Sequence, residues 1–498
     1  MRLRALFAAV VLGAAIAGCQ ADTDITNPNQ PDSQTFWKTQ SDALQGINAT
    51  YNALLRLGTF LRWQGFTYDI RSDIGYSPSP WTDLANFNKF TFATYDFDVN
   101  HDTWNDSYTL VFRANQVIAN VPSIDMDATL RDRIVGEAKF LRALTYFHLM
   151  TLYGAHIPLI TAPPLPGDRP ASSDSATVWA QIEQDLTDAK GALPASYDGA
   201  DLGRATSGAA QALLGKVLLQ ERKWSAAATE LQAVIQSGRY SLAADYGSNF
   251  TPAGRNNSES LFEVQVGDPT LAGSQGVPGL NIAKMIGACG PGYCDGRPTP
   301  WFFAQFFKDS TVDGKVDPRL DATLFWNKPG GEDVYGVPFA SRYADALANH
   351  RPDTLYFKKY GEYWIPGDQS WDANIDYKVL RYADVLLMYA EALNEQGQTD
   401  EAYPYVNQVR QRVNLKPLPT GLDQTGMRDA ILHERLLEFG LEGQRWLDLG
   451  RQNLFADLDA LKAHDPEFQF FTPNKSELLP IPTAEINLNP SIVQNPGW

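Results

Sequence analysis

The residue types that most often perform catalysis are present in this chain, but they form no recognisable catalytic motif. The sequence lacks a nucleophile elbow (G-x-S-x-G), a zinc-protease motif (H-E-x-x-H), a P-loop and a dinucleotide-binding G-x-G-x-x-G. His433 precedes Glu434 and Arg435 within a predicted helix, where a structural ion pair is the simpler interpretation than a proton relay. The 58 acidic residues offer many carboxylate pairs for glycoside hydrolysis, but sequence does not show their separations. We predict no enzyme activity, cofactor or metal, with glycan hydrolysis as an alternative.

Aromatic side chains are the other group that could recognise a ligand. The chain contains 12 Trp, 21 Tyr and 25 Phe. Sugars present flat C–H faces that pack on aromatic rings, although most rings in any domain fill the core. Trp104, Trp179 and Trp224 lie within amphipathic helical patterns, so we predict that they pack internally. Rings in loops, flanked by acidic, amide or arginine groups, are therefore the better candidates for ligand contact.

The first of three cysteines belongs to what looks like an export signal. Arg2 and Arg4 precede an apolar run over residues 5–17, which is too short to span a bilayer comfortably. Small residues then precede Cys19, a layout that resembles a bacterial lipobox. We expect removal of residues 1–18, lipidation of Cys19 and a polar, flexible tether over 19–33. An ordinary cleaved signal with an incidental cysteine is the alternative.

The remaining cysteines, Cys289 and Cys294, stand five residues apart in CGPGYC. Exported proteins meet oxidising surroundings, which favour a disulfide between them. A zinc site would require further ligands, and no histidine lies near in sequence. We therefore predict a disulfide that closes a small loop and presents Tyr293.

The overall charge limits the partners of the chain. With 41 basic and 58 acidic residues, its formal net charge is −17. An acidic surface repels phosphate backbones, so nucleic acid is not an expected partner. Beyond the N-terminus no stretch reaches the roughly 18 apolar residues of a membrane helix. Contact with a membrane is therefore expected only through the lipid anchor.

Hydrophobic periodicity predicts a mostly α fold in one large domain over residues 34–498. A helical scaffold is expected over about 36–240 and 376–460, with long helices at 41–57, 104–121 and 130–153. Helix hairpins at 207–237 and 382–413 match one another faintly after a shift of 174 residues, which indicates tetratricopeptide-like units. Residues 241–375 form a loop-rich α+β insert, where ligand binding usually resides. Residues 470–498 are expected to form an extended C-terminal strap.

Many motifs resemble, in order, those of the SusD/RagB family of nutrient-binding outer-membrane lipoproteins. In the first half these are residues 36–39 (FWKT), 137–147 (EAKFLRALTYF), 152–154 (LYG), 157–160 (IPLI), 203–206 (GRAT), 238–240 (GRY) and 259–265 (ESLFEVQ). In the second half they are 380–392 (LRYADVLLMYAEA), 406–410 (VNQVR), 434–439 (ERLLEF), 442–449 (EGQRWLDL), 479–482 (LPIP) and 494–497 (QNPG). One such motif would be weak, but their order across nearly the whole mature chain is specific.

The resemblance implies a scaffold of about four tetratricopeptide-like units that cradles a ligand-binding lobe. It also implies a lipid-anchored protein of the cell outer membrane, facing the exterior, that passes a glycan to a TonB-dependent (SusC-like) transporter. Peptide cargo, a glycan-degrading lipoprotein and a pure protein scaffold are the alternatives. Candidate ligand contacts are Asp73, which matches an early acidic position of the family, and the residues that we place in loops: Trp81, Asn86, Tyr293, Trp301 and Trp326.

Overall fold

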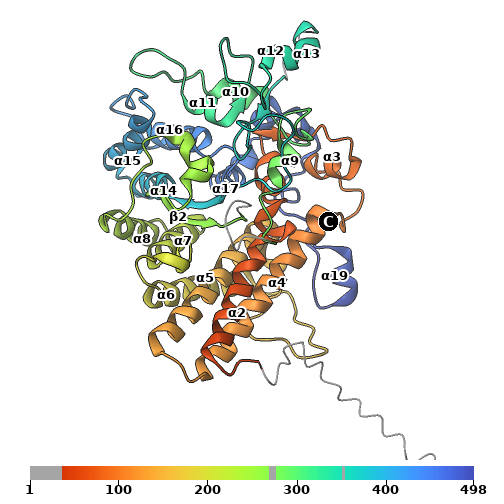
Figure 1. The fold of residues 1–498 in the computed structure, drawn as a ribbon, viewed down its shortest axis with the longest axis vertical. Helices are drawn as coiled ribbons and strands as arrows, with labels where there is room; N and C mark the ends of the chain where they lie inside the picture. The colour runs from red at the N-terminus through yellow and green to blue at the C-terminus, as the bar shows by residue number, and fades with distance from the viewer. Residues whose placement is uncertain (1–35, 268–275, 350, 352–353) are drawn as a thin grey trace, which may run out of the picture.

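A curved stack of helices forms most of the molecule, seen in the lower and middle parts of Figure 1. The computed structural model describes residues 36–267, 276–349, 351 and 354–498. Each main helix packs against the next, from α4 through α5, α6, α7 and α8 to α14 and α15. They are α2 (Gln40–Asn52), α4 (Asp98–Asn120), α5 (Ala128–Tyr153), α6 (Ser175–Ala192), α7 (Ser207–Gln220), α8 (Trp224–Gln236), α14 (Tyr382–Glu395), α15 (Thr399–Arg412) and α16 (Gln424–Glu438). The predicted helix hairpins are present, and the stack resumes at α14 after the insert.

Local sequence signals explain where the long helices begin and end. Thr39 caps α2 and forms a reciprocal capping box with Asp42. Asp127 accepts a hydrogen bond from the backbone N–H of Leu130 at the start of α5. Gly154 ends α5 with a positive φ of 67°, a conformation that glycine adopts without steric cost. The helix predicted over 41–57 is shorter than expected, because α2 gives way to the 3₁₀ turn η1 (Ala53–Leu55) and the π-helical turn η2 (Leu57–Leu61).

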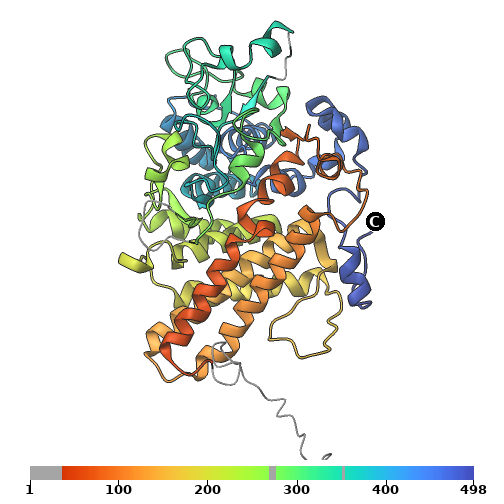
Figure 2. The same cartoon turned by 45° about the vertical axis from the view of Figure 1, so that its right-hand side comes forward.

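The insert forms the upper end of the molecule in Figure 1, and Figure 2 shows the same separation from the side. It contains the short helices α9 (Ile282–Ile286), α10 (Pro300–Gln305), α11 (Arg319–Thr323), α12 (Phe339–Arg342) and α13 (Ala344–Ala348). Three antiparallel strand pairs stabilise it: β1 (Gly75–Tyr76) with β3 (Arg297–Pro298), β2 (Ser260–Val264) with β6 (Tyr377–Arg381), and β4 (Leu324–Phe325) with β5 (Tyr356–Phe357). Two pairs therefore reach beyond the insert, to the segment before α4 and to the strand that leads into α14.

The remaining elements close the scaffold. They are η3 (Phe66–Ile70), α3 (Thr82–Asn88), α17 (Arg445–Arg451), α18 (Leu458–His464), η10 (Pro466–Phe470) and α19 (Thr483–Leu488). The predicted extended strap is thus interrupted by one short helix, α19. Asn495 fixes the end of the strap, because the Asn495 side-chain amide donates to the carbonyl oxygens of Tyr153 and Leu479. Within the described residues, no helix combines the length and the apolar character needed to cross a membrane.

Buried ion pairs hold the second half of the scaffold together. Arg381 at the start of α14 is paired with Glu259, Glu438 and Glu442. Arg435 on α16 is paired with Asp384 at 2.7 Å and with Asp448 at 3.0 Å. All of these side chains are at most 3 % exposed. The network joins helices α14, α16 and α17 to strand β2, so the charged residues of the sequence motifs serve the fold.

Candidate functional site

A row of side chains from distant parts of the sequence lies along one surface between the scaffold and the insert. We define the aromatic row as Tyr293, Trp371, Arg62, Trp63 and Trp81. The rings of Tyr293 and Trp371 meet edge to face at 5.5 Å between centroids. The guanidinium of Arg62 lies 5.0 Å from the ring of Trp371 and 5.2 Å from that of Trp63. Trp63 then meets Trp81 at 6.2 Å, which completes a continuous row.

The three outer rings of the row are accessible to solvent. Trp81 is 39 % exposed, Tyr293 51 % and Trp371 37 %, whereas Trp63 is buried. Trp63 acts as support, because its indole N–H donates to Asp102 at 3.0 Å while its ring contacts Trp81. Large aromatic side chains are rarely left exposed next to one another without a binding role. The row is therefore the best candidate for a ligand surface.

Short, non-helical segments carry the exposed rings. Trp81 is the N-cap residue of α3, and Arg62 and Trp63 directly follow the η2 turn. Trp371 belongs to the loop before β6. Tyr293 lies after α9, in the loop closed by the Cys289–Cys294 disulfide. The scaffold region thus carries Arg62, Trp63 and Trp81, and the insert carries Tyr293 and Trp371.

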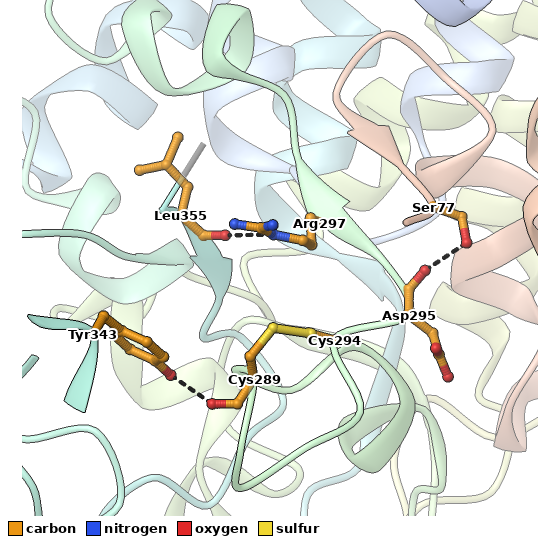
Figure 3. The surroundings of a disulfide bond; sticks show 7 residues. All are labelled: Ser77, Cys289, Cys294, Asp295, Arg297, Tyr343 and Leu355. Carbon is orange, nitrogen blue, oxygen red and sulfur yellow. Dashed lines mark hydrogen bonds between the residues drawn. A yellow bond between two sulfur atoms is a disulfide. The ribbon is translucent and has the colours of Figure 1, made fainter. Parts of the chain in front are cut away.

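The disulfide loop is anchored at several points, as Figure 3 shows for the Cys289 carbonyl and for the segment after Cys294. The hydroxyl of Tyr343 donates to the carbonyl oxygen of Cys289 at 2.9 Å. The ammonium of Lys284 donates to the carbonyl oxygen of Pro291 at 2.8 Å and lies 5.2 Å from the Tyr293 ring. Cys294 has a positive φ of 49°, a conformation unusual for a residue other than glycine. These restraints hold Tyr293 beside Trp371.

Arg62 of the row and the neighbouring Asn281 form a polar network beside the rings. Arg62 donates to the side-chain oxygen of Asn281 at 3.3 Å, but its Nε is buried without a partner among the described residues. Burial lowers the pKa of Arg62, and the nearby carboxylates of Asp102 and Asp98 act in the opposite direction. Asn281 in turn donates to the backbone carbonyl of Trp371 at 2.8 Å. A cation and an amide are therefore fixed between exposed rings.

The structure places Asp73, a predicted ligand contact, in the interior of the molecule. Asp73 is fully buried, and Arg445 binds both of its carboxylate oxygens at 2.7 Å. His464 is hydrogen-bonded to the same carboxylate at 3.0 Å. Burial would raise the pKa of Asp73, but Arg445 and His464 outweigh it and lower the pKa to about 2. The contacts of the Asp73 carboxylate therefore lie inside the fold, and ligand binding by this residue stays a prediction.

The other candidates from the sequence divide between the row and its surroundings. Trp81 and Tyr293 belong to the row. Trp301 stacks on His464 at 3.7 Å, which joins it to the Asp73 cluster. Trp326 packs against Phe303 and Phe307 in a separate aromatic group. Asn86, expected in a loop, lies within α3, where its oxygens accept hydrogen bonds from Thr91. Whether these residues bind a ligand stays a prediction.

Three members of the row were missed by sequence reasoning. Trp371 stands between Ser370 and Asp372 in the loop-rich insert, so the rule that selected Tyr293 also selects it. Arg62 and Trp63 carried no comparable signal, because they follow an apolar helical pattern that predicts packing. Cys19 lies outside the described residues. Within the described part of the chain, no cluster of three or more metal-ligating side chains occurs.

Comparison with known protein families identifies the family of this chain. Residues 258–498 match the model described as the SusD family. Residues 65–219 match a second model, described as starch-binding and associating with the outer membrane. The chain belongs to the SusD family. The two models together cover well over half of the sequence, including most of the scaffold and the disulfide loop.

Similar SusD-like proteins align over nearly their whole length. The SusD-like protein P25 of Formosa agariphila is 28 % identical, with 93 % of this chain and 92 % of the relative covered. A solved SusD superfamily protein of Bacteroides vulgatus has a TM-score of 0.82 at 26 % identity and covers 93 % of this chain and 100 % of its own. A solved laminarin-binding SusD-like protein has a TM-score of 0.74 at 28 % identity, with the same coverage of both chains. The mostly helical architecture with a loop-rich insert is thus the SusD fold.

Proposed function

We propose that this SusD-like chain is a non-catalytic surface lipoprotein that binds a glycan along the aromatic row. The observation that carries the proposal is the row itself, in which exposed rings from three distant segments flank a fixed guanidinium. Sugar C–H faces pack on such rings, while hydroxyl groups pair with arginine and amide side chains. The laminarin-binding relative supports glycan as the ligand class.

Binding to a panel of purified polysaccharides, including laminarin and starch, tests the proposal directly by isothermal titration calorimetry. Replacement of Trp81, Tyr293 or Trp371 with Ala should weaken binding by about 1–3 kcal/mol each, the typical loss of a central interface ring. Trp364→Ala is the matched control, since Trp364 is 43 % exposed in the same insert but lies outside the row. Unchanged affinity in all three row variants would exclude the row as the binding site.

A separate experiment tests whether the protein hydrolyses the glycan that it binds. Prolonged incubation of the bound polysaccharide with the wild-type protein should leave its chain length unchanged when products are separated by size. Appearance of shorter oligosaccharides that persists after further purification would instead favour the alternative of a glycan-degrading lipoprotein. Replacement of individual Asp and Glu residues would then identify the catalytic acid.

Delivery to a TonB-dependent outer-membrane transporter is the second part of the proposal. The lipobox-like sequence before Cys19 supports an anchor at the outer membrane. The tether predicted over 19–33 lies outside the described residues. Detergent extraction should recover the protein with its transporter, because stable partners share large interfaces. Recovery only as a free monomer, from cells that express the adjacent transporter, would contradict this part alone.

A further inference from the structure

A second concave surface lies on the helical scaffold, away from the aromatic row. Helices α5, α6 and α17 and the segment 473–478 enclose a hollow of about 610 Å³ that is open to solvent. None of the residues that line it belongs to the row. Sites for small ligands commonly have volumes of about 300–1,000 Å³. The hollow is therefore large enough for a ligand of one to three sugar rings.

The walls of the hollow combine an apolar floor with one accessible indole. Met150, Leu447 and Phe455 line it and are almost fully buried. Trp179 on α6 lines it as well but remains partly exposed, with its ring 6.2 Å from that of Phe147. The packing role predicted for Trp179 from its helical position therefore describes only part of the side chain. Its exposed part offers a flat apolar face to a ligand.

One carboxylate oxygen at the hollow has no hydrogen-bond partner. Glu477 accepts the backbone N–H of Asn474 through Oε1 at 2.8 Å. Its Oε2 is buried and unpartnered among the described residues. A buried acceptor that stays unpaired is unfavourable, so a donor from a ligand that reaches it would be favoured there. Hydroxyl groups are suitable donors.

Amide side chains also line the hollow and have hydrogen-bonding groups free to bind. Asn453 and Asn474 line the hollow, and neither side chain makes a hydrogen bond to another described residue. Gln220 uses its oxygen to accept from Arg451 at 3.3 Å, which leaves its NH₂ group available. Each amide offers both donors and an acceptor, and each sugar hydroxyl can do both as well. The pattern suits a ligand with several neighbouring hydroxyl groups.

The charges around the hollow favour a neutral ligand. Glu477 is the only ionisable side chain among the lining residues, which disfavours an anion. The buried guanidinium of Arg71, 4.3 Å from the ring centre of Trp446, supplies a compensating positive charge. Burial lowers the pKa of Arg71 to about 9, and Glu477 is among the groups that raise it. The negative charge at the hollow therefore does not require a cationic ligand.

We propose that this hollow is a second saccharide-binding site, specific for neutral sugar rings and independent of the aromatic row. Trp179 carries the apolar face of the sugar. Glu477 accepts hydrogen bonds from its hydroxyl groups, and the amides of Asn453 and Asn474 both accept and donate. The site goes beyond the function proposed for the row, because it would let one protein hold a glycan at two points.

Calorimetry with laminarihexaose, maltohexaose, cellohexaose and xylohexaose on the mature protein tests the second site. The wild type should bind two molecules of at least one of these oligosaccharides per chain. Trp371→Ala should retain one of them, and adding Glu477→Gln or Trp179→Ala should weaken that remaining binding at least tenfold. Glu477→Gln keeps an oxygen for the Asn474 N–H but replaces the unpartnered acceptor with a donor. Phe112→Ala, an exposed scaffold ring outside both sites, is the control and should change nothing.

The possible outcomes separate the two sites. A stoichiometry of one that Trp371→Ala abolishes would overturn the second site and leave the function proposed for the row intact. Residual binding in Trp371→Ala that Glu477→Gln leaves unchanged would overturn it as well. Loss of transporter co-purification in Glu477→Gln, with saccharide binding unaffected, would show that the hollow holds a protein segment. Binding to none of the four oligosaccharides would overturn the second site. Circular dichroism melts of each variant show whether it is folded.

Discussion

The helical scaffold and the aromatic row use their distinctive side chains in opposite ways. On the scaffold, arginine and glutamate side chains turn inward and form ion pairs that water does not reach, as around Arg381 and Arg435. In the row, the large aromatic rings of Trp81, Tyr293 and Trp371 turn outward instead. The motifs by which the sequence resembles its family belong almost entirely to the first region. Family membership therefore describes the support of the binding surface more closely than its ligand.

The largest expected effect comes from breaking the buried network. Arg381→Ala would leave Glu259, Glu438 and Glu442 buried without their shared cation, and should lower the free energy of unfolding by about 3–5 kcal/mol. Chemical denaturation measures this loss. Arg428→Ala is the matched control: its pair with Glu395 at 2.6 Å is 28 % exposed on the arginine side, and should contribute no more than about 1 kcal/mol. Similar losses in both variants would contradict the division between buried and exposed pairs.

Asp73 provides a test at the border between the two regions. Its pKa of about 2 lies below the ordinary value of 3.8, so its ionised form stabilises the fold. That contribution is fully present above about pH 4 and disappears as the pH falls towards 2. It amounts to about 2 kcal/mol, from 1.36 kcal/mol per pKa unit. Asp73→Asn should therefore unfold more easily at neutral pH, with the difference from wild type shrinking below pH 4.

Glycan affinity is the second measurement on the same variant. A folded Asp73→Asn protein should bind within twofold of wild type, because the carboxylate faces Arg445 and His464 and not the solvent. Asp188→Asn removes a partner of Lys139 that is 37 % exposed; it is the control for stability and should change it little. A tenfold loss of affinity without loss of stability would show that Asp73 contacts the ligand.

Much of the scaffold could be predicted from sequence, but the composition of the site could not. Helix periodicity and caps are local, so the predicted 130–153 and 382–395 correspond closely to α5 and α14. The row depends instead on contacts between Trp81, Tyr293 and Trp371, which lie far apart in the chain. The burial of Asp73 could not be predicted from sequence either, because its partners Arg445 and His464 lie far away in the chain. Residue type and loop position were enough to predict Trp81 and Tyr293. Arg62, Trp63 and Trp371 were recognised as members of the row only from the tertiary structure.

A smaller effect is expected from opening the disulfide loop. Cys289→Ser with Cys294→Ser should weaken glycan binding about threefold to tenfold, because Tyr293 must then be ordered on binding, at about 1 kcal/mol. The loss stays moderate, since Tyr343 and Lys284 still hold the loop through backbone carbonyls. Calorimetry on the double variant and on wild type treated with a reductant should agree. If Tyr293→Ala weakens binding but the double variant does not, the disulfide has no part in positioning the ring.

Trp326→Ala should have the smallest effect on glycan binding, within twofold of wild type. Its ring contacts Phe303 and Phe307, and no ring contact links this group to the aromatic row. Trp326 also lines an open hollow of about 400 Å³, but its own polar group is already paired there. Its indole N–H donates to Asp321 at 3.1 Å, and Lys328 binds the same carboxylate. A ligand would have to displace these bonds, whereas the row offers exposed rings beside the Arg62 guanidinium. A tenfold loss in Trp326→Ala, with Trp371→Ala unchanged, would move the binding surface from the row to the outer face of the insert.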